Sequence, residues 1–183
     1  MPTPRLSRQA IERRALQVLR ESGQLHVPVD VEQVAKHLGI RVEYADFGEA
    51  CSGVLVKSED GTAVIGVNWE HHSNRQRFTI AHEIGHFALN HDGSTFVDKG
   101  TYARFRDEES HSGNVTEERQ ANQFAATLLM PTRLVREAFE ERMFDPGDDT
   151  ALGDMARAFQ VSPQAMMFRL QNLGLLKPAK SPF

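Results

Sequence analysis

The chain has 183 residues, of which 40% are hydrophobic and 25% charged, so it is long enough for one hydrophobic core and a small appendage. Its net charge of −4 excludes a global positive field that would attract nucleic acid. The single cysteine, Cys51, excludes an internal disulfide framework and fits a reducing compartment. Because no secretory leader pattern and no run of 18 apolar residues is found, we expect a cytoplasmic protein without membrane contact.

The first part of the chain is predicted to form two helices followed by three strands. Apolar residues at helical spacing predict a helix over residues 5–22, which ends at Gly23. Asp30 is the expected N-cap of a short helix that ends at Gly39. The turn sequence EDG predicts a hairpin between the last two of three β-rich runs. These runs cover residues 40–47, 53–58 and 62–68.

The second part is predicted to be helical apart from one long polar connection, residues 91–114. Helices are expected over residues 72–90, 115–129 and 131–143, and as a short pair within residues 150–174. Strands and helices do not alternate, so the class is α+β. The break DPGDD predicts two domains, residues 1–145 and residues 146–183.

The sequence HEIGH carries the strongest chemical signal. Helix positions i and i+4 share a face, so His82 and His86 can both direct a ring nitrogen at one metal ion. Glu83 is rotated away from the ion but can reach a water as a general base. Gly85 leaves space for another segment close to this face. The alternative is a helix with two partly buried histidines bonded to backbone or water.

A catalytic zinc site with two histidines needs a third protein ligand, so that water can take the fourth position. His91 lies about 140° around the helix from His86 and cannot bind the same ion while the helix continues. Asp92 is a weak candidate, because Leu89 favours continuation of the helix over the turn that this ligand would require. His111 and the acids of the next helix therefore stay open as ligands.

Two acids, Glu117 and Glu118, open the next predicted helix. Asn114 is expected to form a capping pair with Glu117, which leaves Glu118 as the better ligand, with Asn122 one turn on to orient it. The alternative is that both acids stand there because carboxylates favour a helix N-terminus. Small residues let this helix approach the HEIGH helix closely: Ala121, Ala125 and Ala126.

RFTIAHEIGHFALNH followed by EERQANQFAATLLMP closely resembles the ImmA/IrrE family of metallo-endopeptidases, and the resemblance covers nearly the whole chain. It implies a minimal zincin-like metallopeptidase domain, in which a small, mostly antiparallel sheet packs on the HExxH helix, with a C-terminal helix-turn-helix-like bundle. It also implies that His82, His86 and Glu118 bind zinc, with Mn²⁺ as an alternative metal, and that Glu83 is the catalytic acid/base. Family members often have a glutamate where this chain has Gln120, a position that is not a ligand.

The function that the resemblance implies is cleavage of a repressor of the XRE type, which derepresses stress-response or mobile-element genes. The alternative is a non-cleaving, antitoxin-like or DNA-binding protein that retains the metal-binding histidine pair of the HEIGH sequence. Direct binding to nucleic acid is not expected. The second helix of the C-terminal pair would be the recognition helix, and it offers few donors to bases and phosphates. These donors are Gln164, Arg169, Gln171 and Asn172.

Some further residues have both a functional and a structural interpretation. Arg75 either covers the site or holds a carboxylate, or it is salt-bridged at the start of its helix. Cys51 is a redox reporter, a fourth metal ligand or a small buried residue. The strand at 62–68 is expected to offer an open edge to an extended substrate. Candidates to stabilise the oxyanion, unless they are surface residues, are Tyr102, His111 and His91.

Overall fold

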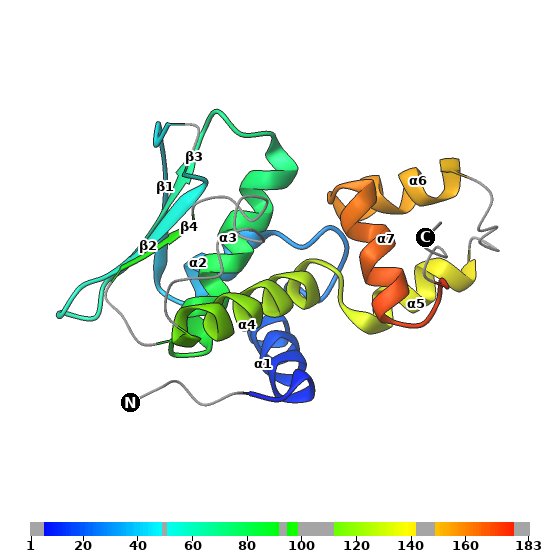
Figure 1. The fold of residues 1–183 in the computed structure, drawn as a ribbon, viewed down its shortest axis with the longest axis horizontal. Helices are drawn as coiled ribbons and strands as arrows, with labels where there is room; N and C mark the ends of the chain where they lie inside the picture. The colour runs from blue at the N-terminus through cyan, green and yellow to red at the C-terminus, as the bar shows by residue number, and fades with distance from the viewer. Residues whose placement is uncertain (1–5, 49–50, 92–94, 99–111, 142–148, 178–183) are drawn as a thin grey trace.

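The computed structural model describes the chain except for residues 1–5, 49–50, 92–94, 99–111, 142–148 and 178–183. The described residues form an α+β fold in which a four-stranded sheet lies on one side of a group of helices (Figure 1). The helices are α1 (Arg8–Glu21), α2 (Val31–His37), α3 (Ser73–Ala88), α4 (Ser112–Leu129), α5 (Thr132–Glu141), α6 (Asp149–Phe159) and α7 (Pro163–Asn172). The strands are β1 (Ile40–Ala45), β2 (Gly53–Lys57), β3 (Ala63–Asn68) and β4 (Thr95–Asp98).

Helix α2 begins and ends where the sequence predicts, whereas α1 begins at Arg8, three residues after its predicted start. Ser7 Oγ accepts a hydrogen bond from the amide of Ala10 at the start of α1. Asp30 Oδ1 accepts from the first free amides of α2, as expected of an N-cap. Gly23 and Gly39 follow the two helices with φ of 70° and 74°, a left-handed conformation that glycine adopts without strain.

The sheet has the strand order β1-β3-β2-β4. The predicted hairpin is confirmed, because β2 and β3 are antiparallel neighbours joined by a turn in which Gly61 has a φ of 86°. β1 runs parallel to β3, and β4 runs antiparallel to β2, so the sheet is mostly antiparallel. The prediction that residues 62–68 offer an open edge is wrong, since β3 is paired on both sides. β4 lies within the stretch 91–114, where no strand was predicted.

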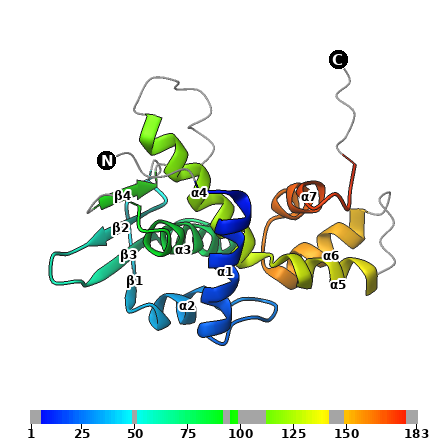
Figure 2. The same ribbon diagram turned by 90° about the horizontal axis from the view of Figure 1, so that it is seen from below.

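Helix α3 packs between the sheet and α4, and Figures 1 and 2 show α4 crossing it on the side away from the strands. The crossing is close at Gly85, because a Cβ atom built there would lie 3.1 Å from both the Cα and the carbonyl oxygen of Ala121. The same Cβ would lie 3.3 Å from Cβ of Phe124. Gly85 therefore provides the space that the sequence predicts, and Ala121 is the small residue that uses it.

The C-terminal helices α5, α6 and α7 lie together on the far side of α4 from the sheet (Figure 1). Arg169 on α7 is only 5% exposed, and its guanidinium donates to the carbonyl of Met130 at 2.9 Å and to Thr132 Oγ1 at 3.2 Å. Burial lowers its pKa to about 10. The charge of Arg169 is thus used within the fold. The predicted domain boundary at residue 145 falls outside the described residues and stays a prediction.

None of the helices among the described residues combines the length and the apolar character needed to cross a membrane.

Replacing Gly85 with alanine should destabilise the protein by about 1–2 kcal/mol, because the cost of overpacking against Ala121 exceeds the gain in helix propensity of about 1 kcal/mol. Gly153, in the interior of α6, is a matched control, since a Cβ there would meet nothing within 4 Å. Gly153→Ala should stabilise by up to about 1 kcal/mol. Urea unfolding of both variants measures the difference. Equal stabilisation by both substitutions would contradict the close crossing.

Candidate metal centre

The end of α3 determines where His91 lies. The helix stops at Ala88, and Asn90 takes a left-handed conformation with φ of 52°. The amide of Asn90 then bonds to the carbonyl of Phe87, and the amide of His91 bonds to the carbonyl of His86 at 3.1 Å. This is the Schellman pattern of a helix C-terminus. It folds the chain back, so that His91 lies against the last turn of the helix.

His82, His86 and Glu118 come together between α3 and α4, with one ligand atom of each within 4.8 Å of the others. Nε2 of His82 and Nε2 of His86 are 3.1 Å apart. Carboxylate oxygens of Glu118 lie 3.4 Å from Nε2 of His82 and 3.6 Å from Nε2 of His86. The two histidines are buried, and the side chain of Glu118 is 17% exposed.

These distances fit a zinc ion. Ligand atoms placed 2.0–2.1 Å from a tetrahedral zinc are separated by about 3.3 Å from one another. The separation of the two imidazole nitrogens, 3.1 Å, is close to this value, and each nitrogen lies 3.4 or 3.6 Å from the nearer of the two Glu118 carboxylate oxygens. Two imidazole nitrogens with one carboxylate oxygen are also a donor set used by catalytic zinc, and three protein ligands leave the fourth position open.

The ring of His86 is neutral at pH 7. Burial lowers its pKa to about 2, and the nearby His82 acts in the same direction. The contact between His86 and Glu118 is therefore not an ion pair in the metal-free protein. A neutral ring that keeps a lone pair on Nε2 can instead bind a metal ion.

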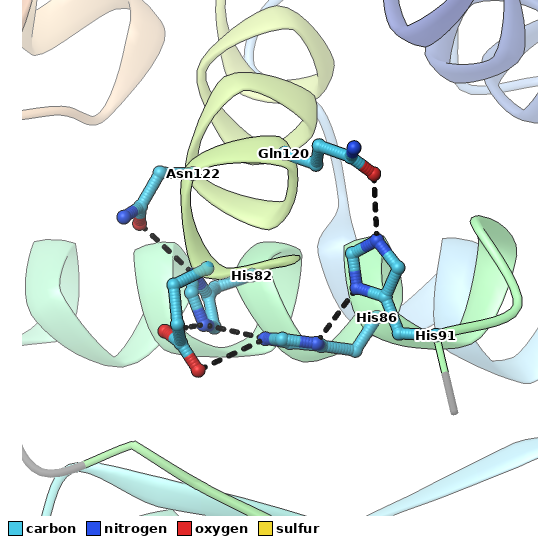
Figure 3. Close-up of polar contacts among 6 residues, drawn as sticks. His82, His86, His91, Gln120 and Asn122 are labelled. Atoms are coloured by element: carbon cyan, nitrogen blue, oxygen red, sulfur yellow. Dashed lines mark hydrogen bonds and ion pairs between the residues drawn. The ribbon is translucent and has the colours of Figure 1, made fainter. Parts of the chain in front are cut away.

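His82 is held by Asn122, whose Oδ1 lies 3.0 Å from Nδ1 of the ring (Figure 3). An amide oxygen can only accept a hydrogen bond, so Nδ1 of His82 carries the proton and Nε2 keeps its lone pair. Asn122 was predicted to orient Glu118. That prediction is wrong, because the side-chain oxygen of Asn122 contacts His82 and not Glu118.

Glu83 is the most completely buried acid near the site, with an exposed fraction of 0%. It follows His82 directly on α3. Glu117 is also buried, at 8% exposed, but it does not belong to the metal-binding group. Glu118, and not Glu117, is the acid whose carboxylate lies near the two histidines, and its role as a metal ligand stays a prediction.

His91 is not an oxyanion donor or a surface residue, which corrects the prediction. Its ring is 1% exposed, Nδ1 lies 2.9 Å from Nδ1 of His86, and Nε2 lies 3.0 Å from Oε1 of Gln120 (Figure 3). Both ring nitrogens are therefore engaged behind the site. The helix periodicity alone did not predict this, because the turn at Asn90 brings the ring back.

Other residues singled out in the sequence lie away from the metal-binding group or outside the described part of the chain. Arg75 donates to Ser52 Oγ at 2.7 Å, so it ties α3 to the start of β2, and no carboxylate of the described residues is paired with it. Cys51 is half-buried, with Sγ 3.5 Å from the carbonyl oxygen of Gly53. Cys51 is not part of the metal-binding group. Residues outside the described ranges are Asp92, Tyr102 and His111.

A groove of about 410 Å³ adjoins Asn122. Its walls come from α1, α3, α4 and α7 and are mainly apolar. The ring of Phe78 lies in this wall, with its centroid 6.2 Å from that of His82. Other residues of the wall include Ala126, Met130, Phe168 and Arg8.

Comparisons with known proteins place this geometry in a family context. A family model described as "IrrE N-terminal-like domain" (Peptidase_M78) matches residues 35–171. A solved structure, named "Mycobacterium tuberculosis transcriptional regulator", is similar, with a TM-score of 0.58 and 20% identity. The match covers 94% of this chain but only 48% of that one, so this chain spans about half of its length. No curated protein matches the chain. The predicted zincin-like α+β class is confirmed.

The metal-free protein should lose stability as the pH falls below about 6.5. The unfolded chain binds a proton at His86 with the ordinary pKa of 6.5, whereas the folded chain binds it only near pH 2. Stability therefore rises with pH between these values, and acidification to pH 5 should cost about 2 kcal/mol. Urea unfolding with a chelator at pH 7.5 and pH 5 measures this loss. His86→Asn, as the control, should lose less between the two pH values; an equal loss would contradict the assignment.

Proposed function

The chain belongs to the Peptidase_M78 family, and from this premise we propose that it is a zinc-dependent endopeptidase. A peptidase-type hydrolase is what the family indicates. The observation that supports the specific proposal is the convergence of His82, His86 and Glu118 beside the fully buried Glu83. In this proposal the first three residues bind the metal and Glu83 is the catalytic acid/base.

The ligand residues are suited to hold zinc in a fixed geometry. When bound, zinc would polarise the scissile carbonyl and lower the pKa of a water towards about 7. His82 presents Nε2 because Asn122 holds its other nitrogen. Glu118 supplies one negative charge from a different helix. Mn²⁺ is the alternative metal, and carboxylate and imidazole ligands do not exclude it.

Glu83 would move the proton during cleavage. Its carboxylate takes a proton from the attacking water, and the same proton later passes to the nitrogen of the leaving amine. Proton transfer by a positioned carboxylate contributes about 10²–10⁴ in rate. We expect the groove beside Asn122 to take an apolar side chain of the substrate, since its walls include Phe78 and Ala126.

The substrate in this proposal is a protein, specifically a repressor of the XRE type whose cleavage derepresses stress-response or mobile-element genes. The chemistry of the site supports only the cleavage of a peptide bond, and the resemblance of the sequence supports the repressor. The similar solved structure is that of a transcriptional regulator, which agrees with a role in gene control.

The second candidate is a DNA-binding or non-cleaving regulatory protein. Arg169, the one cation among the presumed recognition donors, is buried against Met130 and Thr132 and does not reach solvent as a phosphate ligand would. A non-cleaving protein has no need of a buried general base such as Glu83. Binding of duplex DNA that weakens steeply with salt would favour this candidate instead.

Glu83→Gln should keep zinc with nearly unchanged affinity and reduce cleavage by at least about 10²-fold, because the amide cannot accept the proton. Glu118→Gln should weaken zinc binding by at least about tenfold, because it removes a charged ligand. Glu117→Gln is the neighbouring control and should bind zinc like the parent protein. Competition with a chromophoric chelator measures the affinities. Full activity of Glu83→Gln, or equal weakening by both glutamate variants, would remove the assignments.

Incubation with zinc and a purified helix-turn-helix repressor, encoded beside this protein, should yield two fragments on a denaturing gel. Chelator should prevent the cleavage, and added zinc should restore it. Glu83→Gln serves as the control for a contaminating protease. An intact repressor under conditions in which zinc binding is measured directly would count against the repressor as substrate.

A further inference from the structure

Three buried side chains, those of His86, His91 and Gln120, form a hydrogen-bonded relay that begins at Nδ1 of His86. Only His86 is a proposed metal ligand. His86 Nδ1 lies 2.9 Å from His91 Nδ1, and His91 Nε2 lies 3.0 Å from Gln120 Oε1. Figure 3 shows the two rings and the amide in sequence. The exposed fractions of His86, His91 and Gln120 are 0%, 1% and 4%, so bulk water does not compete for these contacts.

Protons in this chain can be assigned from one end to the other. Gln120 Oε1 only accepts a hydrogen bond, so Nε2 of His91 carries a proton. The ring of His91 is 1% exposed and both of its hydrogen-bond partners are uncharged groups, so nothing in contact with it stabilises a second ring proton. Nδ1 of His91 then has a lone pair and accepts from Nδ1 of His86. A neutral His86 with its proton on Nδ1 leaves Nε2 unprotonated. This nitrogen lies 3.1 Å from the unprotonated Nε2 of His82 and 3.6 Å from a carboxylate oxygen of Glu118, so three acceptors converge where a cation would bind.

We propose that Gln120, acting through His91, is a positioning residue that fixes the tautomer and the ring orientation of His86 for metal binding. This inference rests on the proposed role of His86 as a metal ligand. It assigns a function to His91 and Gln120, which both lie outside the HEIGH sequence.

The opposite order of donors and acceptors in this relay would place a proton on the metal-binding nitrogen of His86. If the amide nitrogen of Gln120 faced His91, the protons would shift so that Nδ1 of His91 donated to Nδ1 of His86. A neutral His86 would then carry its proton on Nε2, where a metal ion must bind. The orientation of a single amide therefore decides whether His86 can be a ligand.

The position of His91 is also fixed by contacts other than its two ring hydrogen bonds. The left-handed turn at Asn90 brings His91 back against α3. Nζ of Lys57, from β2, donates to the carbonyl of His91 at 2.8 Å. The ring of His91 also packs edge-on against that of His86, with centroids 4.9 Å apart. Gln120 comes from α4, two residues after Glu118 and two before Asn122, so one helix supports both histidines.

Two variants of Gln120 separate the tautomer from mere packing. In Gln120→Glu an ionised carboxylate can only accept, so the proton order is kept. In Gln120→Leu the volume is similar but the acceptor is lost, and the proton of His86 can occupy either nitrogen. Thr127→Val is the matched control, because Thr127 is a buried polar residue of the same helix whose hydroxyl donates to the carbonyl of Gln123, away from the relay.

The first measurement is the ¹⁵N–¹H correlation spectrum of the histidine rings in the metal-free protein. We expect His86 in the Nδ1–H form in the parent, in Gln120→Glu and in Thr127→Val, and a mixture of both forms in Gln120→Leu. An Nε2–H form of His86 in the parent protein would overturn the proposal, as would an unchanged spectrum of Gln120→Leu.

The second measurement is zinc affinity by competition with a chelator. Loss of a residue that orients a metal-binding histidine typically costs about 10–100-fold in affinity, which is the weakening expected for Gln120→Leu and for His91→Phe. Gln120→Glu and Thr127→Val should stay within about threefold of the parent. Parent-like affinity of Gln120→Leu would overturn the relay. Because neither readout uses cleavage, an inactive parent protein with the expected spectra would contradict the proposed peptidase and leave the relay standing.

Discussion

The close contact between α3 and α4 at Gly85 is the constraint on which the site depends. Helix α3 supplies two of the proposed ligands, His82 and His86. The third, Glu118, comes from α4, so the two helices must lie close together. Gly85 and Ala121 let the two helices approach until a single added Cβ would press on the backbone of the partner. At that separation Glu118 reaches both imidazoles, and Asn122, one turn further, reaches His82 from the other side.

Burial keeps the histidine rings neutral, as metal binding requires, but it also costs free energy if their polar atoms are left without partners. Neutral rings that are buried from solvent need partners for their remaining polar atoms, since an unsatisfied buried donor costs about 1–3 kcal/mol. Asn122 and His91 provide these partners at the Nδ1 atoms of His82 and His86. The same contacts that lower this cost also orient the rings, so the stability of the interior and its suitability for a metal have one structural origin.

The sequence predicted the features that depend on local periodicity or on spacing along one helix. The pair His82 and His86, the alternative between Glu117 and Glu118, and the role of Gly85 all follow from the angular positions of residues on α3 and α4. The central place of β3 and the presence of β4 were not predicted, because strand order depends on pairing between distant segments. His91 was misjudged for a different reason: its position depends on one left-handed residue, Asn90, at the end of the helix, and asparagine in a polar segment is a weak signal of that conformation.

The helix that carries the histidines is also held from the side of the C-terminal bundle. Arg77, five residues before His82, donates to the carbonyl of Gln160 at 3.3 Å and to that of Val29 at 2.8 Å. Burial lowers the pKa of Arg77, so the guanidinium depends on these carbonyls for the hydrogen bonds that water would otherwise supply. Gln160 has a φ of 51° and belongs to the turn between α6 and α7. Displacement of that turn would remove one acceptor from the half-buried guanidinium of Arg77, which lies on the same helix as His82 and His86. The position of the C-terminal helices is therefore coupled energetically to α3.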